Sequence, residues 1–254
     1  MSGCAYSCGM NVSNLSDMFL ARSEEFPSKS VFTFESLESP RPDVWTYAKL
    51  RTGARAVAAR LQTQGLAGKR VLILLPPGPQ YVQALLGCLI SGATAVPAYP
   101  PNFLRTEERI DLVLKDSDAA GVLANQAIHS ALVPADARSD SAWLRKSWVL
   151  VDTVSATDAN AFRIADIRGD DAAVIQYTSG STRDPKGVVL THAQILANLE
   201  CIRHTFRADE NSVGISWLPP YHDMGLFGSL LAPIYSNSRM HLMKPLDFVR
   251  KPER

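Results

Sequence analysis

The residues from Tyr177 to Gly187 have the types and spacing of a phosphate-binding loop. Binding a polyphosphate needs several hydrogen-bond donors close together, a backbone free of bulky side chains, and a cation that neutralises negative charge. Pro185 stiffens the turn before the only lysine of this stretch, and Gly187 follows that lysine. The residues that would bind the phosphates are Thr178, Ser179, Gly180, Ser181, Thr182, Lys186 and Gly187.

Two other kinds of loop do not fit this spacing. A Walker loop has glycine directly before its lysine, whereas Pro185 precedes Lys186 here. The nucleophile elbow of a serine hydrolase needs Gly-x-Ser-x-Gly, and neither Ser179 nor Ser181 has glycines at those positions. The remaining alternative is an ordinary polar surface loop, which seldom ends in a Pro-Lys-Gly sequence.

The sequence predicts strands on both sides of this loop. Residues 172–177 form an apolar run that enters it, and residues 188–190 form a second strand that leaves it. Thr191 and Gln194 fit a capping box that begins a helix, so His192 should stand exposed at the helix start. The loop is thus expected to be held by the sheet at both ends.

Helical and strand patterns alternate along most of the chain, which predicts an α/β layered fold with mostly parallel sheets and flanking helices. Residues 125–147 lack a sustained period and should be the least regular part. Helices are expected at 46–64, 80–90, 106–115 and 226–235, and strands at 71–75, 94–98, 121–124, 148–152 and 213–218.

Composition excludes several classes of protein. Lys and Arg total 26 against 25 Asp and Glu, so no charge excess points to nucleic acid or to an anionic membrane. Prolines divide the uncharged run 71–104 into pieces too short to span a bilayer. Four cysteines without a disulfide framework, and a start unlike a signal peptide, predict a reducing, cytoplasmic location. The five histidines lack metal-site spacing, so no metal site is expected within the chain.

Three stretches together resemble the adenylate-forming, AMP-binding superfamily, which includes acyl-CoA synthetases and peptide-synthetase adenylation domains. They are the loop 177–187, the run Gly-Ala-Thr-Ala-Val-Pro-Ala-Tyr-Pro-Pro at 92–101, and Trp-Leu-Pro-Pro-Tyr-His-Asp-Met-Gly-Leu at 217–226. The last two are most similar to fatty acyl-AMP ligases. Arg183 stands where the superfamily usually has glycine, and fatty acyl-AMP ligases resemble this chain there.

The resemblance implies that a fatty carboxylate attacks the α-phosphate of ATP, that pyrophosphate leaves, and that the acyl group passes to the phosphopantetheine thiol of an acyl carrier protein. Residues 178–182 and Lys186 would hold the phosphates, with Lys186 and His222 as catalytic residues. Tyr221, His222, Met224 and Gly225 would contact the acyl substrate, although aromatic and Met residues at such spacing also fit an ordinary core. We assign no catalytic role to Asp223.

The same resemblance implies that residues 1–254 are part of an N-terminal adenylation domain without its small C-terminal domain. The acidic ligand for Mg²⁺, the ribose-binding aspartate and the C-terminal lysine would lie beyond Arg254, so little ATP–pyrophosphate exchange is expected from the chain alone. An acyl-CoA ligase, an amino-acid adenylation domain and a non-catalytic remnant stay open as alternatives.

Overall fold

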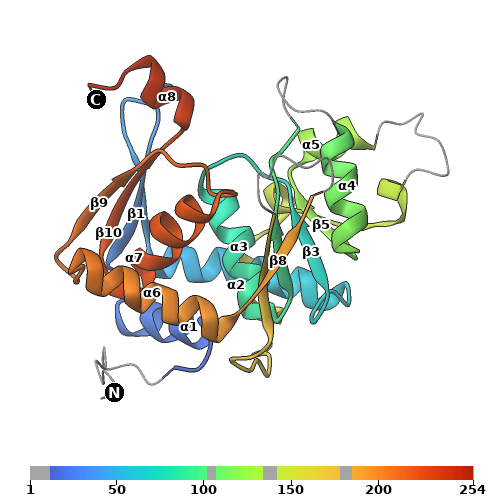
Figure 1. Cartoon of the computed structure of the whole chain (residues 1–254), viewed down its shortest axis with the longest axis horizontal. Coiled ribbons are helices and arrows are strands. Elements are labelled where there is room, and N and C mark those ends of the chain that lie inside the picture. The colour runs from blue at the N-terminus through green and yellow to red at the C-terminus, as the bar shows by residue number, and fades with distance from the viewer. Residues whose placement is uncertain (1–11, 102–106, 134–141, 178–184, 254) are drawn as a thin grey trace.

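The computed structural model describes residues 12–101, 107–133, 142–177 and 185–253. In these residues the chain forms two β-sheets, with helices packed beside and between them (Figure 1). Most neighbouring strands are parallel. The predicted α/β layered fold is therefore confirmed.

The larger sheet carries the strands on both sides of the candidate phosphate loop. Its order is β6-β5-β3-β4-β7-β8, and all neighbours are parallel except β7 and β8. β8 runs antiparallel because the loop between it and β7 is too short for a crossover helix. The strands are β3 (Arg70–Ile73), β4 (Thr94–Pro97), β5 (Gly121–Ala124), β6 (Ser147–Leu150), β7 (Ala172–Tyr177) and β8 (Gly187–Thr191).

The smaller sheet combines two strands from the N-terminal part of the described chain with two from its C-terminal part. Its order is β2-β1-β10-β9, and β1 pairs in parallel with β10 through partners such as Phe32 and Met240. Its strands are β1 (Ser30–Glu35), β2 (Asp43–Thr46), β9 (Val213–Ser216) and β10 (Arg239–Met243). The predicted strand 213–218 is two residues shorter here, because Pro219 and Pro220 follow and cannot donate to a ladder.

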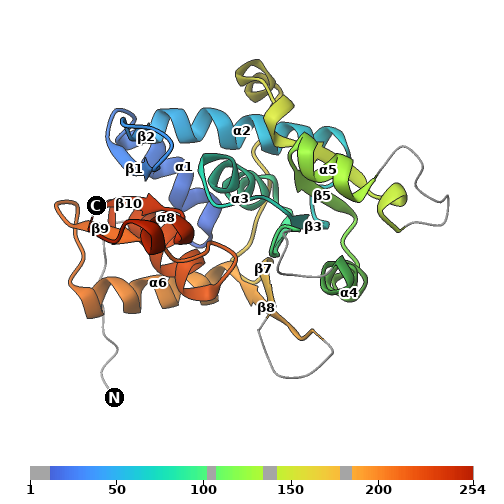
Figure 2. The same cartoon turned by 90° about the horizontal axis from the view of Figure 1, so that it is seen from above.

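Two central helices link the sheets. α2 (Tyr47–Thr63) matches its prediction, and Thr46 caps it by accepting a hydrogen bond from the amide of Lys49 at 3.3 Å. α3 (Pro79–Ser91) lies in the middle of the molecule (Figure 2), and ten of its 13 residues are buried. Near its N-terminal end, the hydroxyl of Tyr81 donates to the carbonyl of Pro220, in the segment that follows β9.

The described residues form six further α-helices. They are α1 (Leu15–Glu25), α4 (Glu107–Ser117), α5 (Gln126–Leu132), α6 (His192–Phe206), α7 (Ala232–Ser236) and α8 (Pro245–Arg250). Within the stretch 125–147, expected to be the least regular, residues 134–141 lie outside the described residues. Its described part begins with the short helix α5, which Asn125 caps by accepting a hydrogen bond from the amide of Ile128. A 3₁₀ turn, Ala142–Arg145, precedes β6.

The apolar helix predicted at 226–235 is two helices of different kinds. Met224–Leu231 is a π-helix, and the amide of Ala232 donates to the carbonyl of Phe227, five residues back. α7 follows it and contains Pro233, which has no amide hydrogen to continue the helix ladder. π-Helical segments are rare, and many of them lie at functional sites.

His192 is buried, with 1% of its surface exposed, so the prediction of an exposed side chain was wrong. Its Nδ1 accepts a hydrogen bond from the backbone amide of Leu15 at 3.2 Å. The predicted capping box of Thr191 and Gln194 is confirmed at the same helix start. The helix begins where expected, and α1 then covers the histidine.

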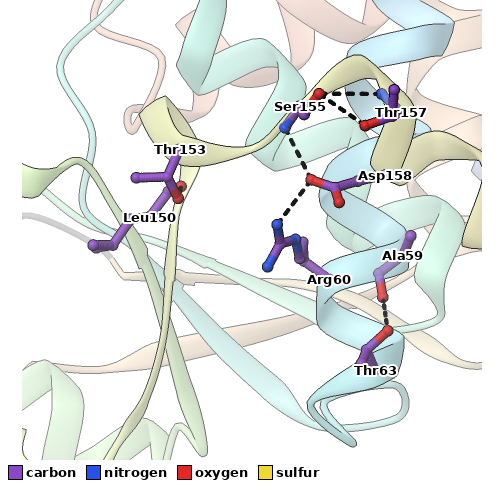
Figure 3. A network of polar contacts seen from close by, with 8 residues as sticks. All are labelled: Ala59, Arg60, Thr63, Leu150, Thr153, Ser155, Thr157 and Asp158. Carbon is purple, nitrogen blue, oxygen red and sulfur yellow. Dashed lines mark hydrogen bonds and ion pairs between the residues drawn. The ribbon is translucent and has the colours of Figure 1, made fainter.

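The segment between β6 and β7 returns across α2 and is held there by polar contacts (Figure 3). The amide of Ser155 donates to Oδ2 of Asp158 at 2.9 Å, and the same oxygen lies 3.1 Å from Nη2 of Arg60. These contacts lower the pKa of Asp158, and the backbone hydrogen bond from Ser155 is the largest cause. The connection to β7 is thus tied to a helix that packs against α3.

Candidate active site

A cavity of about 130 Å³ lies at the carboxyl ends of β4 and β7, which are neighbours in the larger sheet. Ligands of α/β sheets bind at this edge, where the parallel strands end. Its walls are mostly apolar and aromatic, with a few polar groups among them. The lining residues are Pro97, Ala98, Tyr99, Arg109, Ile110, Val113, Gln176, Tyr177, Tyr221, His222 and Asp223.

The candidate phosphate loop leaves the sheet at this cavity. Tyr177, the last residue of β7, lines the cavity and pairs with Gly187, the first residue of β8. Lys186 is exposed directly before this pair. Thr178, Ser179, Gly180, Ser181 and Thr182 lie outside the described residues. The prediction that the sheet holds both ends of the loop is confirmed by the Tyr177–Gly187 pair.

Gly187 is required by the close approach of two side chains. A Cβ at this position would lie 2.8 Å from Cγ2 of Ile175 and 3.0 Å from Cζ of Tyr177. Tyr177 donates from its hydroxyl to Oδ2 of Asp116 at 2.6 Å. Burial raises the pKa of Tyr177, and the bond to Asp116 raises it further, so the hydroxyl stays protonated. The ring is thus fixed between β8 and α4.

His222 and Asp223 form a close pair at the mouth of the cavity. Nδ1 of His222 lies 2.6 Å from Oδ1 of Asp223, and both side chains are about half exposed. A proton on Nδ1 donates to this carboxylate, which leaves Nε2 for a ligand. The same Oδ1 accepts from the amide of Met224 at 2.6 Å and begins the π-helix. Asp223, to which we assigned no catalytic role, therefore orients the predicted histidine.

Tyr221 forms the aromatic wall of the cavity. Its ring centroid lies 4.0 Å from that of Tyr99 and 6.5 Å from that of Tyr81. Tyr81 is fully buried in α3, and its hydroxyl donates to the carbonyl of Pro220. The predicted pair Tyr221 and His222 is thus brought to one cavity.

The other two predicted acyl contacts lie elsewhere. Met224 is 63% exposed and does not line this cavity. Gly225 lines a second cavity of about 250 Å³, between β1, the start of α3 and the π-helix. A Cβ on Gly225 would overlap the carbonyl oxygen of Pro219, so this glycine lets the π-helix start against the preceding turn. Residues adjacent in sequence therefore face different sides of the turn 219–223.

Gln176 is a cavity residue that the sequence analysis did not select. It is 7% exposed, and its Nε2 donates to the carbonyl of Tyr221 at 2.9 Å. The sequence held a signal for it, because an amide side chain interrupts the otherwise apolar run before the loop. Arg109 also lines the cavity, and its neighbours Ile110 and Val113 contribute apolar wall.

The described residues include no group of three His, Cys, Asp or Glu side chains that could hold a metal ion.

Cys88 is buried in α3, which raises the pKa of its thiol, while Cys201 is exposed. In the described part of the chain, no helix has the length and apolar character that crossing a membrane requires.

Comparisons with known proteins agree with this arrangement. A family model described as AMP-binding enzyme matches residues 19–254. The medium-chain-fatty-acid–[acyl-carrier-protein] ligase JamA of Moorena producens is 32% identical, over 95% of this chain and 41% of JamA. The long-chain-fatty-acid–AMP ligase FadD26 of Mycobacterium tuberculosis is 33% identical, over 92% of this chain and 41% of FadD26.

A solved structure shows the same likeness in three dimensions. The fatty acyl-adenylate ligase from L. pneumophila, in complex with acyl adenylate and pyrophosphate, matches with a TM-score of 0.87 and 34% identity. The match covers 95% of this chain and 41% of that protein. The chain therefore spans about two-fifths of the length of these relatives.

Proposed function

Because the chain belongs to the AMP-binding enzyme family, we propose that it supplies the loop and the carboxylate-binding turn of a cytoplasmic, ATP-dependent fatty acyl-adenylate ligase. Residues 1–254 would form part of the N-terminal adenylation domain. The products would be acyl-AMP and pyrophosphate, with a carrier-protein thiol as the acyl acceptor. The names of JamA, FadD26 and the L. pneumophila enzyme support this choice of substrate.

One observation carries the proposal. Tyr177, which ends the strand entering the loop, and His222 line the same cavity at the carboxyl ends of parallel strands. A phosphate bound by the loop and a carboxylate bound near His222 would thus meet at one place. That meeting is what adenylate formation needs, since positioning of two substrates supplies much of the rate of such reactions.

Each group has a distinct part in the reaction. A carboxylate oxygen attacks the α-phosphorus, and the bond from that phosphorus to the bridging oxygen breaks as pyrophosphate leaves with the electron pair. Lys186 and the hydroxyls and amides of the loop would neutralise the leaving charge. Nε2 of His222, with Asp223 holding Nδ1, would donate to the carboxylate or to the adenylate oxygens when protonated.

The cavity fits the apolar part of an acyl substrate. Ile110, Val113 and Ala98 offer aliphatic surface, and Tyr99 and Tyr221 offer aromatic surface. Magnesium, which ATP brings to such enzymes, would balance the phosphate charge, but the described residues offer no cluster of ligands for it. Its ligand would come from another part of a complete ligase.

An acyl-CoA ligase is the second candidate. FadD21 of Mycobacterium tuberculosis, described as a putative fatty-acid–CoA ligase, is 31% identical over 96% of this chain and 44% of FadD21. The adenylation step is common to both candidates, because both would need the same loop and the same turn. They differ in the acceptor thiol, so a transfer assay of the complete ligase with CoA and with a carrier protein separates them.

The loop assignment can be tested on this chain by calorimetric titration with ATP. Lys186→Ala should weaken ATP binding roughly tenfold or more, because a charged hydrogen bond to phosphate is worth about 1.5–3 kcal/mol. Lys69→Ala is the matched control, since Lys69 is exposed at the opposite, amino end of the sheet beside β3. Equal ATP affinity of the parent and Lys186→Ala would remove the basis of the proposal.

A further inference from the structure

Two buried side chains hold the turn that carries His222. The hydroxyl of Tyr81 donates to the carbonyl of Pro220 at 3.0 Å, and Nε2 of Gln176 donates to the carbonyl of Tyr221 at 2.9 Å. These are successive carbonyls, and the next residue is the histidine. The donors come from α3 and from β7, so two separate elements fix the same turn.

Gln176 holds this turn although its own acceptor is unsatisfied. Its Oε1 is buried and has no hydrogen-bond partner among the described residues. A buried acceptor without a partner costs about 1–3 kcal/mol, so an aliphatic side chain of the same size would serve a purely structural role better. Val174, two residues earlier on the same face of β7, is aliphatic and fully buried. The amide therefore has a use that packing does not provide.

The position of Gln176 in the chain indicates that use. Tyr177 follows it and pairs with Gly187 across the neck of the candidate phosphate loop. The side chain of Gln176 thus spans from the strand that enters the loop to the turn that bears His222. This hydrogen bond joins β7 directly to the turn.

We propose that Gln176 is a positioning residue that sets the His222 turn against the strand entering the loop, so that the sites for phosphate and carboxylate keep a fixed relation. The inference rests on the proposed function for the identity of the two ligands. The hydrogen bond from Gln176 to Tyr221 is independent of that function. A displaced turn would carry the His222 ring and its partner Asp223 away from the cavity.

The first experiment needs no ligand. Proton–nitrogen NMR spectra of the histidine rings would be compared for the ¹⁵N-labelled parent, Gln176→Met and Gln64→Met, with the His222 signals assigned from His222→Gln. In Gln176→Met the His222 ring signals should shift or broaden, while those of His129, His192, His204 and His241 stay in place. Unchanged His222 signals in a folded Gln176→Met protein would overturn the proposal.

Gln64→Met is the matched control, because Nε2 of Gln64 also donates to a backbone carbonyl, that of Trp148, at 3.2 Å. It should leave the His222 signals unchanged, and a shift as large as that in Gln176→Met would overturn the proposal. If Gln176→Met does not fold, Gln176→Leu takes its place, because leucine also lacks the donor. Unchanged His222 signals in a folded Gln176→Leu protein then count against the proposal.

A second titration separates this inference from the proposed function. Adding Mg²⁺ and ATP to the parent should shift the His222 signals, and the shift at saturation should be at least halved in Gln176→Met. Failure of the parent to bind ATP would refute the loop assignment. The ligand-free spectra would still show whether Gln176 positions the His222 turn. Saturable ATP binding with equal His222 shifts in both proteins would refute the coupling and leave the proposed function standing.

Discussion

The backbone amide of Leu15 donates to Nδ1 of His192, and this contact joins the start of α1 to the start of α6 across 177 residues of chain. The ring is buried, and burial lowers its pKa to about 4, although Asp171 and Asp17 nearby act in the opposite direction. His192 is therefore neutral in the fold at neutral pH, with Nδ1 free of a proton.

This buried ring predicts loss of stability in mild acid. The pKa of His192 is about 4 in the folded protein and about 6.5 in the unfolded chain. Its contribution to the free energy of unfolding is therefore complete above about pH 6.5 and decreases as the pH falls to about 4. Below that pH the contribution changes no further. The full effect is about 3 kcal/mol. Urea unfolding at intervals between pH 7 and pH 4 measures it. His192→Gln keeps an acceptor for Leu15 without titrating, so its stability should fall less over this range. Parallel curves for the two proteins would contradict the assignment.

The second prediction compares alanine substitutions at two glycines of the π-helix, Gly225 and Gly228. Gly225→Ala places a methyl group on the carbonyl of Pro219, so the turn must move at a cost of about 1–3 kcal/mol. Gly228→Ala is the control, since nothing lies within 4 Å of its Cβ position. Urea unfolding should show a clear loss for the first variant and none for the second. Equal stability of the two variants would refute the close approach.

Asp223 offers a third test, because its carboxylate both caps the π-helix and contacts His222. Asp223→Ala should lower the free energy of unfolding by about 1 kcal/mol through loss of the cap. Asp223→Asn keeps an acceptor for the amide of Met224 and should cost less than about 0.5 kcal/mol, since an exposed ion pair contributes little. The comparison uses chemical denaturation at pH 7. An equally large loss in both variants would show that the charge, and not the cap, is what matters.

Local patterns predicted the elements well. The helix Tyr47–Thr63 was found to within one residue at each end, because Thr46 caps it and its apolar residues recur with helical spacing. The strand before the loop was found because five apolar or aromatic residues and one glutamine precede a glycine-containing segment. Such signals lie within one stretch of chain, so they need no knowledge of distant partners.

Contacts between distant segments were not predictable in this way. His192 has the sequence context of an exposed helix start, yet it is buried and contacts Leu15 at the start of α1, 177 residues away. Tyr221 and Gly225 are four residues apart, yet the turn between them directs them to different cavities. The role of Gln176 depends on its bond to Tyr221, 45 residues later. Sequence patterns thus identified the loop and the histidine, and the fold supplied the residues that hold them.

The last prediction concerns a complete ligase that carries this chain, and it separates the two proposed catalytic residues. Lys186→Ala should chiefly raise the KM for ATP, because the exposed ammonium stands at the exit of a loop suited to phosphates. His222→Ala should chiefly impair use of the fatty acid, because the ring shares its cavity with Tyr99, Ile110 and Val113. Loss of one charged hydrogen bond of about 1.5–3 kcal/mol corresponds to roughly a tenfold to hundredfold fall in kcat/KM for the affected substrate.

The measurement is steady-state formation of acyl-AMP, with ATP and a medium-chain fatty acid varied separately at equal amounts of folded protein. Lys69→Ala and His204→Ala serve as controls, since both residues are exposed and lie outside the cavity. They should behave like the parent, because neither can reach the carboxyl ends of β4 and β7. An unchanged ATP dependence in Lys186→Ala would refute the phosphate-loop assignment. An equal fall in kcat/KM for ATP and for the fatty acid in His222→Ala would place the histidine where both substrates react. It would contradict a role for His222 in binding the carboxylate alone.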